Sequence, residues 1–372
     1  MRTVLTNKTF LEREAFCILG LPFDRVNLDN AMSSIYDSIK ADSNLFLSTP
    51  NLNFAIATQL DKEFFQSVVD SDLSVADGMP LIWIAKLLGV PLTERVAGSD
   101  LFSALSLQEN KAKKIKVFFF GGQAGIAEIA SHKLNESSSG MEGCGFYDPG
   151  FVSIDDMSSP AIIEQINNTC PDFLVVALGA KKGQQWIQKN RNDLNSNIIS
   201  HLGAVVNFVA GQVDRAPVIW QKLGFEWLWR IYQEPVLWKR YTIDGLALLQ
   251  LMVTKVLPLA IYDRILKRTR SYKLANKTKV LSKGKLISLS GSIHHGNITE
   301  FKQGLQEALL KNDDVALECS QLSYIDSAFI ATLLLFQAHL SEQNRQLMLC
   351  NVSKRIKKIL RLNNTLIRFK CI

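Results

Sequence analysis

Short apolar runs alternate with amphipathic stretches along the first 210 residues. Four runs are typical of buried strands that end in small or polar residues, at 44–49, 114–122, 171–179 and 197–204. Between them, apolar residues recur at helical spacing over 54–71, 124–137 and 184–194. This alternation predicts an α/β fold with a Rossmann-like, mainly parallel sheet covered on both faces. Ligands of such sheets bind at the carboxyl ends of the strands, so we look for chemistry directly after these runs.

The pattern changes after residue 210. Residues 211–242 are rich in aromatic and basic side chains, and 245–262 form an apolar stretch interrupted by Lys255 and Pro258. That stretch is close to the roughly 20 residues that span a bilayer. The internal lysine and proline favour an amphipathic helix lying at a membrane surface, and a buried core helix is the alternative.

A new alternation of strands and helices starts at residue 285 and predicts a small, separate α/β domain. We therefore predict a first domain over 1–242, whose last part, about 205–242, forms an appendage. A linker of apolar and then basic residues follows over 243–283, and the last domain covers 284–372.

The charge of the chain is concentrated in one stretch. Residues 263–283 hold eight Lys and Arg against the single Asp263, which accounts for the net charge of +7. Such a cluster attracts an anionic membrane surface or nucleic acid. No helix-turn-helix or RNA-reading motif accompanies it, so we predict no nucleic-acid partner. The first residues lack the apolar core of a signal peptide, which favours the cytoplasm.

Six scattered cysteines and five histidines show no metal-binding or disulfide spacing, so we predict neither a metal site nor a cofactor.

Polar candidates follow the predicted strands. Thr49 and Asn51 offer a hydroxyl and an amide to a ligand, although Thr and Asn are also common in turns and helix caps. Asp77, followed by Gly78, is placed to act as a general base, with a helix cap as the alternative. Arg95 lies in another turn, where a guanidinium can bind a diphosphate.

Two further segments suit an anionic ligand. Gly121 and Gly122 end an apolar run, where backbone N–H groups can approach a phosphate, although the segment lacks the spacing of known glycine-rich fingerprints. Arg215, Arg230 and Arg240 lie among tryptophans and tyrosines, a mixture typical of a membrane surface, a protein interface or a nucleic-acid surface.

The order of these motifs resembles the WecG/TagA/CpsF glycosyltransferase family. The series is TPN, ADGMPLIW, RVAGSDLF, FFGG, GAVVNFVAGQVDRAP, GFEWLWRIYQEP and RY, over residues 44–241. The resemblance implies an inverting, metal-independent transfer of N-acetylmannosamine, or its uronic acid, from UDP. The implied acceptor is a sugar on a polyprenyl diphosphate, in the synthesis of teichoic acid, enterobacterial common antigen or capsule.

The same resemblance implies roles for the candidate residues. Asp77 is the expected catalytic base, Thr49 lines the sugar pocket and Arg95 supports the substrate or departing phosphate. The appendage arginines are expected to meet the lipid diphosphate. Further substrate contacts are expected from Asn51, Gly78, Gly121, Gly122 and Gln184.

Three positions depart from the family pattern. The Gln-Glu pair of GxPKQExW is Gly183-Gln184 here, so a donor contact is lost or moved. Asn207 stands in place of an aspartate, and Leu237 in place of an appendage arginine. These departures support an alternative function, a regulatory scaffold whose transferase domain has decayed.

The tail resembles a STAS domain, the fold of anti-sigma factor antagonists. Ser327 matches the position at which such domains are phosphorylated, and an N-capping serine is the alternative interpretation. A protein partner is expected to bind this domain, and a homo-oligomer is left open. We expect the whole protein to be peripheral on the inner face of the cell membrane.

Overall fold

The computed structural model describes residues 10–109, 113–269, 279–283, 285–311 and 313–372. These residues form two compact units, which are described separately. The first contains 26–80 and 94–244, and the second contains 10–25, 81–93 and the described residues from 245 to the C-terminus.

A six-stranded sheet forms the centre of the first unit, and all the strand pairs described in it are parallel. Its order is β4-β3-β8-β7-β5-β6, with β4 at Leu73–Ser74, β3 at Leu45–Ser48, β8 at Ile198–His201, β7 at Phe173–Ala177, β5 at Ile115–Gly121 and β6 at Met141–Tyr147. The predicted α/β class with a mainly parallel sheet is confirmed.

Helices connect and extend these strands. They are α1 Leu28–Lys40, α2 Leu52–Leu60, α3 Lys62–Val69, α4 Met79–Leu88, α5 Gly98–Leu107, α6 Ile126–Ser137, α7 Pro160–Asn168, α8 Ala180–Asn190 and α9 Gly203–Val209. The predicted appendage contains α10 Val218–Leu223 and α11 Glu226–Gln233, followed by α12 Trp238–Leu251.

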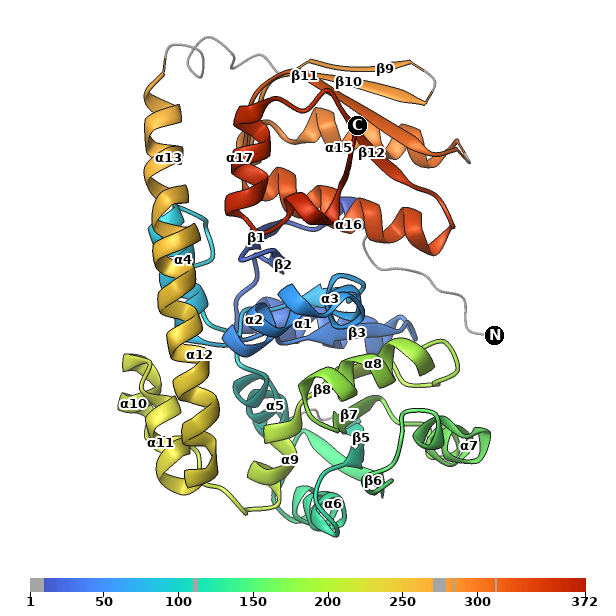
Figure 1. The fold of residues 1–372 in the computed structure, drawn as a ribbon. Helices are drawn as coiled ribbons and strands as arrows, with labels where there is room; N and C mark the ends of the chain where they lie inside the picture. Colours follow the sequence, from blue (N-terminus) through green and yellow to red (C-terminus); the bar gives the residue numbers. More distant parts are fainter. Residues whose placement is uncertain (1–9, 110–112, 270–278, 284, 312) are drawn as a thin grey trace. The chain divides into compact units, whose positions relative to one another are not determined.

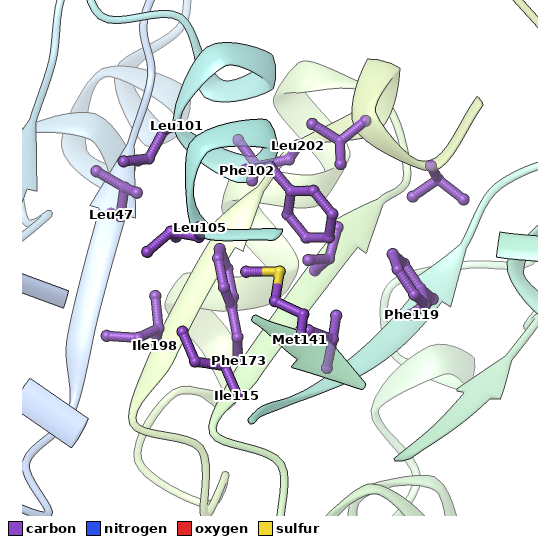
Figure 2. Packing of buried hydrophobic residues seen from close by; sticks show 14 of the residues in the cluster. Leu47, Leu101, Phe102, Leu105, Ile115, Phe119, Met141, Phe173, Ile198 and Leu202 are labelled. Carbon is purple, nitrogen blue, oxygen red and sulfur yellow. The ribbon is translucent and has the colours of Figure 1, made fainter. Parts of the chain in front are cut away.

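Large apolar side chains fill the space between this sheet and its helices. Phe102 of α5 lies 6.2 Å from the ring of Phe119 and 6.1 Å from that of Phe173, between centroids. Figure 2 shows these rings around Met141, with Leu202 beside them. The strands β3, β5, β7 and β8 are almost wholly buried, which explains their continuous apolar runs.

Two elements differ from the predicted pattern. The helix predicted over 54–71 is two helices, because Asp61 caps α3 by accepting a hydrogen bond from the Phe64 N–H at 2.9 Å. The strand predicted over 197–204 ends at His201, and α9 begins at Gly203. A helix cap or an early helix start depends on local hydrogen bonds, which the spacing of apolar residues does not indicate.

The second unit contains the C-terminal α/β domain. Its five-stranded sheet has the order β13-β12-β11-β10-β9, parallel except for β9 against β10. The elements are β9 Lys279–Lys283, β10 Leu286–Ile293, α15 Thr299–Leu309, β11 Val315–Ile325, α16 Ser327–Glu342, β12 Leu347–Cys350, α17 Lys354–Leu362 and β13 Lys370–Cys371. Figure 1 shows this sheet together with α15, α16 and α17.

An N-terminal hairpin belongs to the second unit, which the sequence pattern did not indicate. Strands β1 (Ala15–Ile18) and β2 (Leu21–Asp24) pair antiparallel, and both pack against α16. Their turn has positive φ at Leu19 and Gly20. Arg13 binds Asp24 at 2.8 Å with both side chains largely buried, which holds the start of this hairpin.

The apolar stretch after residue 244 is helical throughout. A π-helical turn at Met252–Val256 joins α12 to α13 (Leu257–Arg268), next to Pro258, which lacks a backbone donor. The segment Pro235–Arg268 is long and apolar enough to cross a membrane by length and composition, and 22% of its most apolar window is buried. It is therefore not a buried core helix. The predicted basic cluster continues through 270–278, which lie outside the described residues.

One close approach in the first unit gives a stability prediction. A Cβ atom at Gly183 of α8 would lie 2.2 Å from Cδ2 of His201, so Gly183→Ala forces the buried imidazole to move. We expect a loss of about 1–3 kcal/mol in the free energy of unfolding, measured by urea denaturation. The double variant Gly183→Ala/His201→Ala lacks this clash, so we expect it to recover part of the lost free energy of unfolding.

Gly245→Ala is the matched control, because nothing lies within 4 Å of its Cβ position in α12. It should be neutral or stabilising by less than about 1 kcal/mol. Equal effects at positions 183 and 245 would contradict the packing of His201 against α8.

Candidate functional site

The site is built where two neighbouring strands end. Thr49 follows β3, and Asp77 lies in the loop between β4 and α4. The Asp77 N–H donates to Pro50 O at 3.0 Å, and the Val96 N–H donates to Ala76 O at 3.0 Å. These two hydrogen bonds join three loops that are far apart in sequence. Gly98 then lies against the side chain of Thr49, and the absence of a Cβ atom at Gly98 leaves room for Leu202, whose Cδ2 would lie 2.4 Å from it.

An ion-pair network surrounds Arg95. Its Nη2 lies 2.6 Å from Asp100 Oδ2, and its Nη1 lies 2.5 Å from Glu226 Oε2. Arg215 binds the other oxygen of Asp100. The four side chains are 14–29% exposed, so the network is partly desolvated rather than free on the surface. It connects the start of α5 with the appendage helix α11.

The environment of Asp77 raises its pKa to about 7, mainly because burial disfavours the charged carboxylate. Arg95 opposes this shift, whereas Glu226 and Asp100 add to it by repulsion. A hydrogen bond from the Gly98 backbone also favours the ionised form. Asp77 nevertheless keeps part of its surface accessible. A carboxyl group that titrates near neutral pH suits a general base.

The three appendage arginines lie in different environments. Arg215 joins the network through Asp100. Arg230 binds Glu234 at 2.8 Å and lies over the Phe208 ring, 5.6 Å from its centroid. Arg240 lies over the ring of the adjacent Tyr241 at 4.9 Å. Of these predicted arginines, Arg215 is the one that an ion pair ties to the Arg95 network in the described structure.

Two predicted substrate contacts have structural hydrogen bonds. Asn51 caps α2 by accepting a hydrogen bond from the Phe54 N–H at 3.2 Å. The Gln184 amide is fully buried and bonds to Ser48 Oγ, with its nitrogen at 3.0 Å. The Gln184 contact fastens α8 to the end of β3. Both remain predictions as substrate contacts.

The predicted glycines lie at different strand ends. Gly78 has a φ of +134° directly after Asp77, which favours glycine at that turn. Gly121 ends β5 and Gly122 follows it, and both have positive φ. In the sheet order, β8 and β7 stand between β5 and β3. The Gly121-Gly122 turn therefore shares the carboxyl edge with Asp77 but is not its neighbour.

Sequence reasoning missed three residues around the site. It did not single out Glu226 at all, and it gave no role to Asp100. It also passed over His201, which is 9% exposed. Burial lowers the pKa of His201 to about 4, so the imidazole ring is neutral. The sequence indicates Glu226 indirectly, because it lies in the motif GFEWLWRIYQEP.

In the second unit, Ser327 is the first residue of α16. Asp326 caps this helix, accepting hydrogen bonds from the Phe329 and His295 N–H groups at 3.0 and 2.8 Å. Ser327 lines a cavity of about 250 Å³ together with His295, Lys267 and Asp263. Ser327 therefore lies both at the start of a helix and at the edge of a cavity.

Among the residues that the structure describes, no group of three or more His, Cys, Asp or Glu is placed to hold a metal ion.

The pKa of Asp77 predicts a pH-dependent stability. An aspartate in the unfolded chain titrates near about 4, so between that pH and 7 the folded state binds more protons than the unfolded state. The free energy of unfolding therefore falls as the pH rises through this window. Asp77→Asn removes this loss, and we expect its Tm to exceed that of the wild type at about pH 8 and to converge with it near about pH 4.

Thermal unfolding followed by circular dichroism checks this expectation. Asp193→Asn makes the same change at an exposed position. A pH-dependent difference of similar size in that control would contradict the assignment of the effect to Asp77.

Comparisons with known proteins show which families the two parts of the chain match. Residues 16–260 match the model of the glycosyl transferase WecG/TagA/CpsF family, and residues 280–365 match the model described as Mlab, STAS domain. The sequence resemblances to both are therefore confirmed. The family match includes Asp77, Arg95 and Glu226.

Curated relatives are similar to this chain over somewhat more than half of its length. One is an N-acetylglucosaminyldiphosphoundecaprenol N-acetyl-beta-D-mannosaminyltransferase of Bacillus spizizenii, 28% identical over 195 residues, which are 52% of this chain and 74% of the relative. A protein of the same name from Staphylococcus aureus is 25% identical over 225 residues, 60% of this chain and 85% of the relative.

Proposed function

The chain belongs to the WecG/TagA/CpsF family of glycosyl transferases, and from this premise we propose that it moves N-acetylmannosamine, or its uronic acid, from UDP to a sugar on a polyprenyl diphosphate. The names of its relatives support this choice of sugar and acceptor. The observation that carries the proposal is Asp77, a carboxyl group with a pKa of about 7 at the carboxyl edge of the sheet.

In the proposed reaction, Asp77 accepts the proton of an acceptor hydroxyl. The acceptor oxygen then forms a bond to the anomeric carbon as the bond from that carbon to the UDP oxygen breaks. Attack from the face opposite UDP inverts the configuration. Asp77 is suited to this step because a base with a pKa near the working pH is substantially ionised and still a good proton acceptor.

The departing UDP gains negative charge, which needs cations or N–H donors. Arg95 and Arg215 are the cations of the network next to Asp77. A guanidinium has five N–H donors, so the contacts of Arg95 with two carboxylates leave donors for a phosphate oxygen. We propose that these arginines stabilise the leaving group in a transfer that is independent of a metal ion.

Replacing the base tests the reaction. Asp77→Asn keeps the shape of the side chain but cannot accept the proton, so we expect kcat to fall about 10²–10⁴-fold. Release of UDP from UDP-N-acetylmannosamine, with an N-acetylglucosamine-diphosphate-lipid acceptor, measures this. UDP affinity by calorimetry should change little.

Asp193→Asn should retain wild-type turnover, because its side chain is exposed. A wild-type protein that neither turns over several UDP-sugars nor binds UDP would instead support the regulatory scaffold. Full activity in Asp77→Asn would refute Asp77 as the base.

We also propose that the protein attaches to a membrane surface through its long apolar helix. A stripe of exposed apolar side chains recurs every three or four residues from α12 to α13, at Leu246, Leu249, Val253, Leu257, Ile261 and Ile265. This is the spacing of one helix face. Arg264, Lys267 and Arg268 are exposed near its end, where they can meet anionic headgroups.

Polar substitutions in the stripe test this attachment. Leu246→Ser/Leu249→Ser/Val253→Ser should lower the partition onto anionic liposomes by about tenfold or more, since even partial insertion of three apolar side chains exceeds about 1.4 kcal/mol. Co-sedimentation measures the bound fraction.

Leu60→Ser/Leu107→Ser/Leu310→Ser is the matched control, because those residues are 94%, 70% and 85% exposed outside the stripe. Equal binding of the two triple variants would reject the attachment. A protein that resists carbonate extraction would show a spanning helix in place of a peripheral one.

Ser327 is proposed as a phosphorylation site of the STAS domain. Its place at the start of α16 supports this, because a helix N-terminus stabilises a phosphate. The nearby Lys267 and His295, which line the same cavity, offer further donors.

A further inference from the structure

Glu226 contacts the catalytic loops from the appendage. It is the first residue of α11, and its carboxylate lies 2.5 Å from Nη1 of Arg95, although the two residues are 131 positions apart. The Arg95 and Glu226 side chains are 14% and 20% exposed. A partly desolvated pair of this kind is more strongly coupled than a surface ion pair. It is the direct ionic contact described between α11 and the loop that carries Arg95.

The charges around Asp77 come from three elements. Arg95 lies in the loop before α5, Asp100 lies on α5, and Glu226 comes from α11. The Gly98 N–H adds a hydrogen bond from the start of α5, and Arg215 acts through Asp100. The first turn of α4, directly after the Asp77 loop, is apolar at Met79–Ile82. Two cations and two carboxylates besides Asp77 therefore set its electrostatic environment.

Glu226 raises the pKa of Asp77 in two ways. Its negative charge repels the ionised Asp77 carboxylate, and its pairing with Arg95 offsets the cation that would otherwise stabilise that carboxylate. Without α11 in place, Arg95 and Asp100 remain, and water reaches the loop more easily. Asp77 is then a weaker proton acceptor, because its ionised form is better stabilised.

We infer that Glu226 is a positioning residue that couples the docking of α11 to the strength of Asp77 as a base. The inference rests on the proposed function, in which Asp77 takes the proton of the acceptor. Docking of α11 through the Glu226–Arg95 contact thus makes Asp77 a stronger base. With α11 undocked, the weaker base would activate water less well, so the donor would be protected from hydrolysis.

A purely structural role for Glu226 makes a different prediction. If the carboxylate only fastens α11, its loss lowers protection of the helix and reduces turnover, but the pH dependence of the reaction stays where it was. The pH profile separates the two roles.

The test compares Glu226→Gln, Glu226→Asp and a charge-matched control, Glu136→Gln. Glu136 is exposed in the last turn of α6 and has no part in the site. In Glu226→Gln, the acidic limb of kcat/KM should move to lower pH by about half a unit or more, with plateau kcat several-fold lower and donor KM within about twofold. Glu226→Asp should restore part of both, and Glu136→Gln should match the wild type. An unmoved limb in Glu226→Gln would overturn the inference.

A second readout does not require turnover. The difference in stability that Asp77→Asn causes reports the ionisation of Asp77 in the folded state. Measured in the Glu226→Gln background, its pH window should shift downward, and in the Glu136→Gln background it should not. A shifted window without any sugar transfer would sink the proposed reaction but uphold the coupling. An unshifted window together with normal sugar transfer would uphold the proposed reaction and overturn the coupling.

Discussion

The site depends on keeping the Asp77 carboxylate largely buried near the Arg95 guanidinium without a one-to-one ion pair between them. Arg95 lowers the pKa of Asp77, yet the net shift is upward to about 7, because burial and two further carboxylates outweigh it. Asp100 and Glu226 engage both Nη atoms of Arg95, so the cation is shared among several anions. In the proposed transfer, the same network places positive charge near the departing diphosphate and leaves Asp77 able to accept a proton.

The parallel sheet makes this network possible. Since all its strands run in one direction, the loops after β3 and β4 must lie at the same edge, and backbone hydrogen bonds from Asp77 and Val96 hold them together. This part of the fold was predictable, because buried parallel strands appear as continuous apolar runs. The candidates Thr49 and Asp77 were found for the same reason, because each follows an apolar run, whereas Arg95 was predicted from its place in a turn.

The features that sequence reasoning missed depend on contacts between distant residues. The Glu226 contact spans 131 positions, and no periodicity indicates which carboxylate meets Arg95. The hairpin β1–β2 is short and buried, so it has neither a long apolar run nor a clear alternation, and its packing against α16 is a tertiary contact. The break at Asp61 depends on one capping hydrogen bond, which a helical pattern on both sides conceals.

The departure at Gly183 has a physical counterpart in His201. A side chain at position 183 would collide with the imidazole, so the small residue and the large one are matched across α8 and β8. The neighbouring Gln184 is held by Ser48 at the end of β3, which leaves its amide occupied in the described structure. The departure at Gly183 is therefore matched by the packing of His201 against α8, and these contacts do not include Asp77.

The second unit links the apolar helix to the C-terminal domain. Tyr324 Oη donates to Asp263 Oδ1 at 2.5 Å, and Lys267 Nζ lies 2.7 Å from Asp263 Oδ2, so α13 is tied to the end of β11. Figure 1 shows α13 alongside α17, where Lys358 lies over the Tyr262 ring at 4.2 Å. If the exposed stripe of this helix rests on a bilayer, these contacts hold the STAS domain at the same surface. A partner that binds the STAS domain would then meet it at the membrane, where the lipid-linked acceptor of the proposed reaction also resides.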